Sequence, residues 1–189
     1  EASLGDFTFG RRDLRLIPLA LLVGAIATLV AVVLLALIGL VTNLAYYGRV
    51  STELVSPPLD LGPMTVLIPV VGGLVIGVMA RYGSEHIRGH GIPEAMETIL
   101  VGGSRVEPRL AVLKPVSSAV SIGTGGPFGA EGPIILTGGA AGSLVGQLQH
   151  LTAAERRTLL VAGAAAGMTA VFGTPVAATL LGTELLLFE

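Results

Sequence analysis

The chain has 189 residues, of which 52% are hydrophobic and 13% charged, with 27 glycines, no cysteine and a formal net charge of −2. A soluble domain carries about 25% charged residues, so this lower share predicts an integral membrane protein whose surface faces lipid. The absence of cysteine excludes a disulfide framework and a thiolate metal site, and no basic stripe indicates a nucleic-acid partner.

The first predicted element is an apolar helix from about residue 17 to residue 47, with no charged residue along its length. A bilayer core needs about 20 helical residues, so we expect this helix to span the membrane. It is too long for the apolar core of a cleaved signal peptide. Arg11, Arg12 and Arg15 precede it and favour a cytoplasmic N-terminus.

A polar loop follows, and a second span is predicted from about residue 64 to residue 80. Beyond it the apolar segments are short and are interrupted by Gly and Pro. Hydrocarbon cannot satisfy free backbone groups, so broken helices survive only inside protein or along a water-filled cavity. The pattern predicts an all-α polytopic membrane protein whose broken and re-entrant helices line a polar space.

Three prolines, Pro93, Pro133 and Pro175, each follow a turn that contains glycine and precede an apolar run. A missing N–H costs nothing in the first helical turn, so each proline predicts a helix start. Helix N-termini carry unpaired N–H donors and a partial positive charge, and in transporters with broken helices they point at anionic ligands. Three convergent helix starts therefore predict an anion site.

Small residues four positions apart lie on one helix face and let membrane helices approach closely. This spacing predicts a packing role for Gly73, Gly77, Gly138, Gly142, Gly146, Gly163 and Gly167. The stretch GTGGPFG, residues 123–129, lacks the spacing of a phosphate-binding loop, so nucleotide binding is not expected.

Three blocks carry a more specific pattern: GHGIPE at 89–94, GAEGP at 129–133 and AGAAAGMTAVFGTPVAATLLGTELL at 162–186. They resemble motifs of the CLC family of chloride channels and chloride/proton antiporters, namely G-S-G-I-P-E, G-K/R-E-G-P and an Ala/Gly-rich helix before an Asn-x-Pro turn. The resemblance runs from about residue 15 to the end. It identifies 1–189 as the N-terminal half of a CLC-type membrane domain, the first of two inverted repeats.

The resemblance implies a multi-pass protein of the cell (inner) membrane that moves chloride or a similar anion, with no cofactor and no metal site. Its complete form would be a homodimer with one pore in each subunit. The second half is absent from this chain, so we expect either a fragment or a part that associates with the missing half. A passive channel, a chloride/proton antiporter and a non-transporting structural fragment all stay open.

Within this resemblance Glu131 matches the gating glutamate, whose ionised carboxylate occupies an anion position and moves away or takes a proton when anions pass. Its place beside Pro133 favours a negative charge, and a helix-capping carboxylate is the alternative. The helix starts around 89–93 and 129–133 are expected to bind the anion. The candidate anion-binding residues are His90, Gly91, Ile92, Gly129, Ala130 and Gly132.

Two of these positions depart from the family. His90 replaces the serine that coordinates the central anion, and its ring either donates to the anion or turns toward the cytoplasmic vestibule. Ala130 replaces a basic residue and removes a charge that attracts anions. Lys114 either supplies part of that field or snorkels to an interface.

Glu131 and Glu184 form the candidate proton path. The resemblance places the proton-accepting glutamate of the antiporters at Leu185, and one residue along a helix is a rotation of about 100°, so Glu184 should face elsewhere. We expect Glu94 and Glu97 to be first-turn carboxylates without a transport role.

An intramembrane enzyme is not expected. His86, His90 and His150 lack the spacing of a metal-binding H-E-x-x-H pair, and no G-x-S-x-G turn accompanies them.

Overall fold

The structure is a computed structural model that describes residues 13–58, 62–84, 87 and 91–187. Every element within these residues is helical, which confirms the all-α prediction. In chain order the elements are η2 (Asp13–Arg15), α1 (Leu16–Tyr47), η3 (Gly62–Val66), α2 (Leu67–Tyr82), α3 (Gly91–Leu100), α4 (Pro108–Gly123), α5 (Glu131–Leu148), α6 (Ala153–Phe172) and α7 (Pro175–Leu185).

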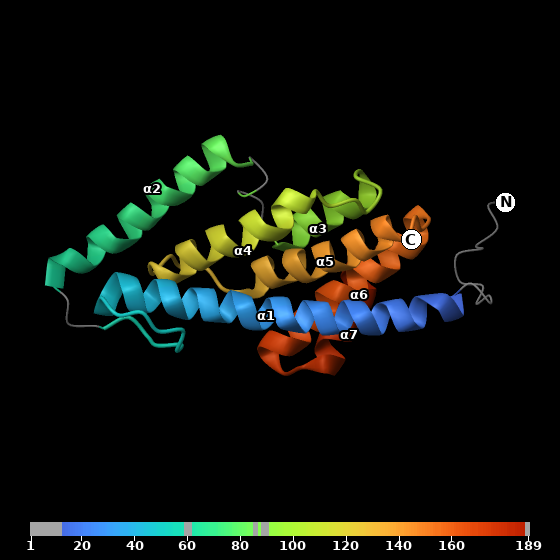
Figure 1. Ribbon diagram of the computed structural model, residues 1–189, viewed down its shortest axis with the longest axis horizontal. Helices are drawn as coiled ribbons and strands as arrows, with labels where there is room; N and C mark the ends of the chain where they lie inside the picture. Colours follow the sequence, from blue (N-terminus) through green and yellow to red (C-terminus); the bar gives the residue numbers. More distant parts are fainter. Residues whose placement is uncertain (1–12, 59–61, 85–86, 88–90, 188–189) are drawn as a thin grey trace.

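Helix α1 is the long apolar helix expected from the sequence, and it runs the length of the molecule (Figure 1). Its most apolar window of 18 residues has a mean hydropathy of 3.0, and only 28% of that window is buried. Among the described helices it alone is long and apolar enough to cross a bilayer, while α2 is apolar but shorter, with 16 residues. Most of the apolar surface of α1 therefore faces outward.

Several helices are too short to cross a bilayer, as the interrupted pattern predicted. Helix α3 has 10 residues and α7 has 11, whereas a crossing needs about 20. The three prolines lie in first turns, because Pro93 and Pro133 take the third position of α3 and α5 and Pro175 takes the first position of α7. The sequence pattern thus located these helix starts correctly.

Helices α5 and α6 pack backbone against backbone at the centre of the fold. A Cβ atom at Gly138 would collide with the carbonyl of Gly163, and one at Gly142 would collide with the carbonyl of Leu159. Only glycine permits this approach, which lets small residues pack where lipid gives apolar surfaces no preference for one another. The predicted packing role is confirmed for Gly138, Gly142, Gly146, Gly163 and Gly167.

Helix α2 projects away from the other helices (Figure 1). The packing role predicted for Gly73 and Gly77 is wrong for the described structure, since a Cβ at either position would have no atom within 4 Å. Gly72 makes the close approach instead, because its Cα lies against the side chain of Thr124 at the end of α4. The face of α2 that makes the contact is therefore offset by one residue from the face that the glycine spacing predicted.

One polar side chain, Asn43, is fully buried near the end of α1. Its Nδ2 donates to the carbonyls of Gly39 at 2.8 Å and Glu53 at 2.7 Å, and its Oδ1 accepts from Nε of Arg49 at 2.7 Å. These bonds hold the segment that follows α1 along the helix (Figure 1). Because a buried polar group costs free energy only when it is unpaired, Asn43 is compatible with its apolar surroundings.

The packing of α5 on α6 predicts the effect of a single added methyl group. Replacing an exposed helical glycine by alanine gains about 1 kcal/mol from helix propensity, but at Gly142 the methyl would collide with the backbone of Leu159. We expect Gly142→Ala to destabilise the protein by about 1–3 kcal/mol, measured as a lower Tm in detergent. The control, Gly77→Ala, adds the same methyl to open space and should leave Tm unchanged or higher. Equal effects of the two substitutions would contradict the packing described above.

Candidate functional site

The starts of α3 and α5 touch through their backbones. A Cβ at Gly91 would collide with Cα of Gly132, and a Cβ at Gly132 would lie 3.2 Å from Cα of Gly91. Gly91 also has a φ of +33°, a region that side chains disfavour. Gly91 thus needs to be glycine, a Cβ at Gly132 would be tightly packed, and two helix N-termini meet at one point.

A cavity of about 720 Å³ lies beside this contact. Its walls come from α2, α4, the segment 124–130 and the first turns of α3 and α5. The cavity brings together five of the residues singled out from the sequence, namely Gly91, Ile92, Gly129, Glu131 and Gly132. The predicted convergence holds for two helix starts and is wrong for the third, because Pro175 at the start of α7 does not line the cavity.

Glu131 is the first residue of α5, and its side chain is exposed to the cavity. None of the described residues donates a hydrogen bond to its carboxylate, and the N-cap residue of α5 is Ala130, which has no side-chain cap. The helix start is instead stiffened from within, because the hydroxyl of Thr137 donates to the carbonyl of Pro133. Glu131 therefore presents an unengaged carboxylate at a helix N-terminus.

The other residues predicted from the resemblance are less central. Ala130 is half-buried and packs on the hydrophobic core rather than lining the cavity. His90 lies outside the described residues, as does His86. Glu184 is exposed near the end of α7 and does not line the cavity, and α7 lies on the other side of α1 from α4 (Figure 1). The structure thus does not bring Glu184 to Glu131.

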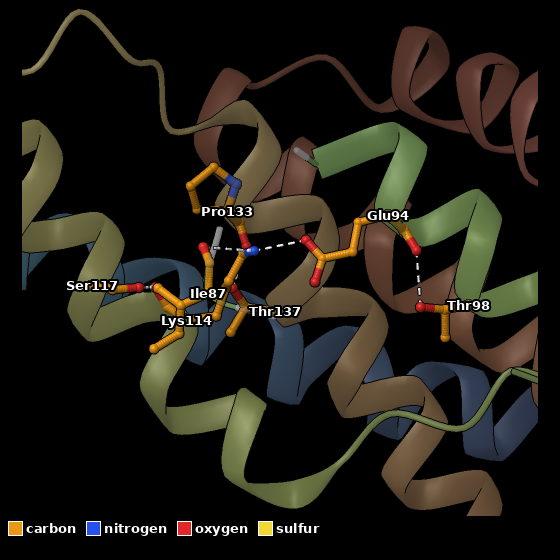
Figure 2. A network of polar contacts seen from close by, with 7 residues as sticks. All are labelled: Ile87, Glu94, Thr98, Lys114, Ser117, Pro133 and Thr137. Atoms are coloured by element: carbon orange, nitrogen blue, oxygen red, sulfur yellow. Dashed lines mark hydrogen bonds and ion pairs between the residues drawn. The ribbon is translucent and has the colours of Figure 1, made fainter. Parts of the chain in front are cut away.

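Lys114 on α4 is buried and paired (Figure 2). Its Nζ lies 2.7 Å from Oε2 of Glu94 and donates to the carbonyl of Ile87 at 3.2 Å, and the side chains of Lys114 and Glu94 are 6% and 15% exposed. The snorkelling interpretation is therefore wrong, because protein oxygens rather than interfacial water solvate the ammonium. Through these bonds α4 holds the chain on both sides of Gly91.

Lys114 also separates two cavities. It lines the larger one and a second cavity of about 260 Å³, which is lined by Glu94, Glu97, Arg105 and Glu107. Glu94 is in the first turn of α3 as predicted, whereas Glu97 lies beyond the first turn, so the first-turn role predicted for Glu97 is wrong. The second cavity is lined by charges of both signs, among them Glu107, the N-cap residue of α4.

One wall of the larger cavity is a row of hydroxyl groups on α4 that the sequence reasoning missed. Its members share one helix face with Lys114, at spacings of three and four residues. They are Ser117, Ser118, Ser121 and Thr124. The signal was present as polar residues at helical intervals within an apolar segment.

The end of α4 is fixed to α1 by Tyr46. Its hydroxyl donates to the carbonyl of Thr124 at 2.9 Å, and Gly125 has a φ of +89°, with no space for a Cβ beside the tyrosine oxygen. The turn that follows leads directly to Glu131. Helix α1 thus contributes to the position of the carboxylate although it does not line the cavity.

Residues 72–189 match the family described as voltage gated chloride channel. The chain belongs to this family. It is 33% identical over 124 residues to a ClcB-like chloride channel protein of Ralstonia nicotianae, which covers 64% of this chain and 29% of the relative. It is 32% identical over 177 residues to the H(+)/Cl(−) exchange transporter ClcA of Citrobacter koseri, covering 88% of this chain and 36% of the relative.

A third relative is the voltage-gated ClC-type chloride channel ClcB of Yersinia pseudotuberculosis, with 27% identity over 143 residues, 74% of this chain and 34% of the relative. The chain therefore spans about a third of the length of the curated relatives it matches. No solved structure matches it. The family assignment confirms the resemblance seen in the sequence motifs.

The ion pair between Lys114 and Glu94 predicts non-additive effects of substitution. Lys114→Met should destabilise the protein by about 3–5 kcal/mol, because it leaves a buried carboxylate without its cation. Adding Glu94→Gln removes the orphaned charge and should recover part of the loss. Thermal unfolding of the two single variants and the double variant in detergent measures the coupling. Strictly additive losses would show that the two side chains do not depend on each other.

Proposed function

We propose that the protein containing this chain moves chloride or a similar monovalent anion across a membrane, and that Glu131 gates this movement. The observation that carries the proposal is the contact of Gly91 with Gly132, because it brings two helix N-termini to one cavity. The first N–H groups of a helix have no partner within the helix, and they favour negative charge. The names of the relatives, chloride channels and a proton/chloride exchange transporter, agree with this chemistry.

The gating role rests on the place of the Glu131 carboxylate. It stands at the N-terminus of α5, lines the cavity and accepts no hydrogen bond from the described residues. An ionised carboxylate there competes with a mobile anion for the same dipoles and N–H donors. Protonation or a change of rotamer removes the competitor, so the anion pathway opens without a change of fold.

The anion-binding residues of the proposal are those of the two helix starts. Gly91, Ile92, Gly129 and Gly132 line the cavity and offer backbone groups, while Ala130 is the N-cap residue of α5. His90 immediately precedes α3 in the sequence. We include Ala130 and His90 in the proposal on the basis of their place in the two motifs.

The complete transporter requires more than this chain. The matches cover 29% and 36% of the lengths of two relatives. We propose that the remainder of the protein closes the cavity, and that the complete form is a homodimer in the cell (inner) membrane. The outward apolar surface of α1 is consistent with contact to lipid.

Passive chloride movement is the simpler form of the proposal. A proton path through Glu131 and Glu184 would need to connect the cavity to α7, and Glu184 does not line the cavity. Position 185, where the family resemblance places the proton-accepting carboxylate, is leucine. The relatives include both channels and an exchange transporter by name, so the coupling is left to experiment.

The gate is tested by Glu131→Gln in the complete protein, reconstituted in liposomes and assayed by chloride efflux at several pH values. The amide has nearly the same shape but cannot ionise, so we expect efflux to persist and to lose the pH dependence that the carboxylate confers. Glu97→Gln, a matched change outside the cavity, should leave the pH profile intact. Wild-type efflux and wild-type pH dependence in Glu131→Gln would contradict the gate.

Coupling is tested by proton flux in the same liposomes. With a chloride gradient and no pH gradient, we expect robust chloride efflux with no uphill proton movement, since Glu184 on α7 does not line the cavity. Uphill proton movement would contradict the passive form. In that case Glu184→Gln decides the path, because a loss of proton movement with chloride efflux retained would assign it to Glu184.

A further inference from the structure

In helices α1 and α3 to α7, every serine and threonine hydroxyl except two donates a hydrogen bond to a protein oxygen. Serine and threonine in membrane helices commonly donate to the carbonyl three or four residues earlier. In α1 and in α3 to α7 the hydroxyls that do so belong to Thr28, Thr42, Thr98, Ser117, Thr137, Thr158, Thr169, Thr179 and Thr183.

Ser143 on α5 is also engaged, because it donates to the carbonyl of Ser104 at 2.6 Å. Thr124, just past α4, donates to the carbonyl of Val120 at 2.7 Å. The exceptions are Ser118 and Ser121, whose hydroxyls have no hydrogen-bond partner among the described residues. Both are half-buried, and both line the larger cavity.

The neighbours of these two serines explain part of the exception. The carbonyl of Lys114, four residues before Ser118, already accepts the hydroxyl of Ser117 at 3.0 Å. The other hydroxyls of the wall, those of Ser117 and Thr124, therefore donate to carbonyls within α4, whereas those of Ser118 and Ser121 do not. Three residues separate the two serines, so they lie one above the other on the cavity face of α4.

We infer that Ser118 and Ser121 form a binding subsite for a monovalent inorganic anion such as chloride on the α4 wall of the cavity. The inference rests on the proposed function and adds to it a third element, α4, beside the starts of α3 and α5. Neither hydroxyl oxygen is a buried atom without a partner, so both are accessible from the cavity and can donate to an anion there. The subsite lies one and two turns along α4 from Lys114.

The surroundings favour an anion over a cation at this wall. Two helix N-termini open into the same cavity, and their partial positive charge opposes a cation. Glu131 is the one carboxylate among the described lining residues. In the proposed mechanism it leaves its position when the anion moves, and a chloride held by Ser118 and Ser121 then occupies a position along the pathway.

The test uses the complete protein in detergent, with chloride binding measured by calorimetry, and in liposomes, with chloride efflux measured by electrode. The variants are Ser118→Ala, Ser121→Ala and the double substitution. The matched control is Ser117→Ala, which removes a hydroxyl from the same wall that is already engaged with Lys114. Ser121→Thr keeps a hydroxyl donor and controls for disturbed packing.

Hydrogen bonds to a charged group are strong enough that losing one weakens binding about tenfold or more. We expect chloride affinity to fall by about that factor in each alanine variant and further in the double variant, with Ser117→Ala and Ser121→Thr close to wild type. Thiocyanate is less strongly hydrated than chloride, so its affinity should fall less in the alanine variants. The ratio of chloride to thiocyanate efflux should therefore fall. A purely structural role would not change that ratio.

Wild-type chloride affinity and an unchanged efflux ratio in the double variant would overturn the subsite. If the wild-type protein transports chloride and the double variant behaves in the same way, the subsite is wrong and the proposed function stands. A wild-type protein without chloride binding or efflux would overturn the proposed function. If the double variant does not yield folded protein, the two single variants carry the same comparison against Ser117→Ala.

Discussion

Two helix starts touch through backbone atoms at Gly91 and Gly132, where a side chain at Gly91 would collide with the backbone of Gly132. The rest of the cavity is arranged around this contact, since it fixes where the N–H groups of α3 and α5 point and where Glu131 stands. Helix dipoles act within about one turn of the helix end. A separation of a few ångströms between the two starts would therefore divide the proposed anion site into two weak ones.

The contact is held in place from two sides. Helix α5 is packed backbone to backbone on α6 through Gly138 and Gly142. Helix α3 is much shorter, and the bonds from Lys114 to Ile87 and Glu94 fix the chain before and after its start. A short helix at the edge of a cavity has little buried area of its own, so a buried ion pair gives it a defined position that apolar packing alone would not.

The features that the sequence predicted are those that depend on local rules. Pro93, Pro133 and Pro175 located three helix starts because the constraint on proline acts within one turn. The spacing of Gly138 and Gly142 predicted a packing face because the partner was another helix of the same bundle. The same spacing predicted a packing face wrongly at Gly73 and Gly77. Four-residue periodicity shows which residues share a helix face but not whether another helix packs on that face.

Features that depend on distant residues were not predictable in this way. Glu94 and Lys114 are 20 positions apart, and only the fold brings their side chains to 2.7 Å. Ser118 and Ser121 differ from the other helical serines and threonines because their hydroxyls donate no hydrogen bond to the described residues. A sequence pattern does not show this difference. The positive charge of Lys114 is matched by Glu94 within the protein, and Ala130 adds none. If the proposed function holds, the cavity recruits anions through dipoles and hydroxyls, whose fields decay faster with distance than that of a net charge. Under that proposal, selection among anions depends on fit at contact range rather than on steering from bulk solution.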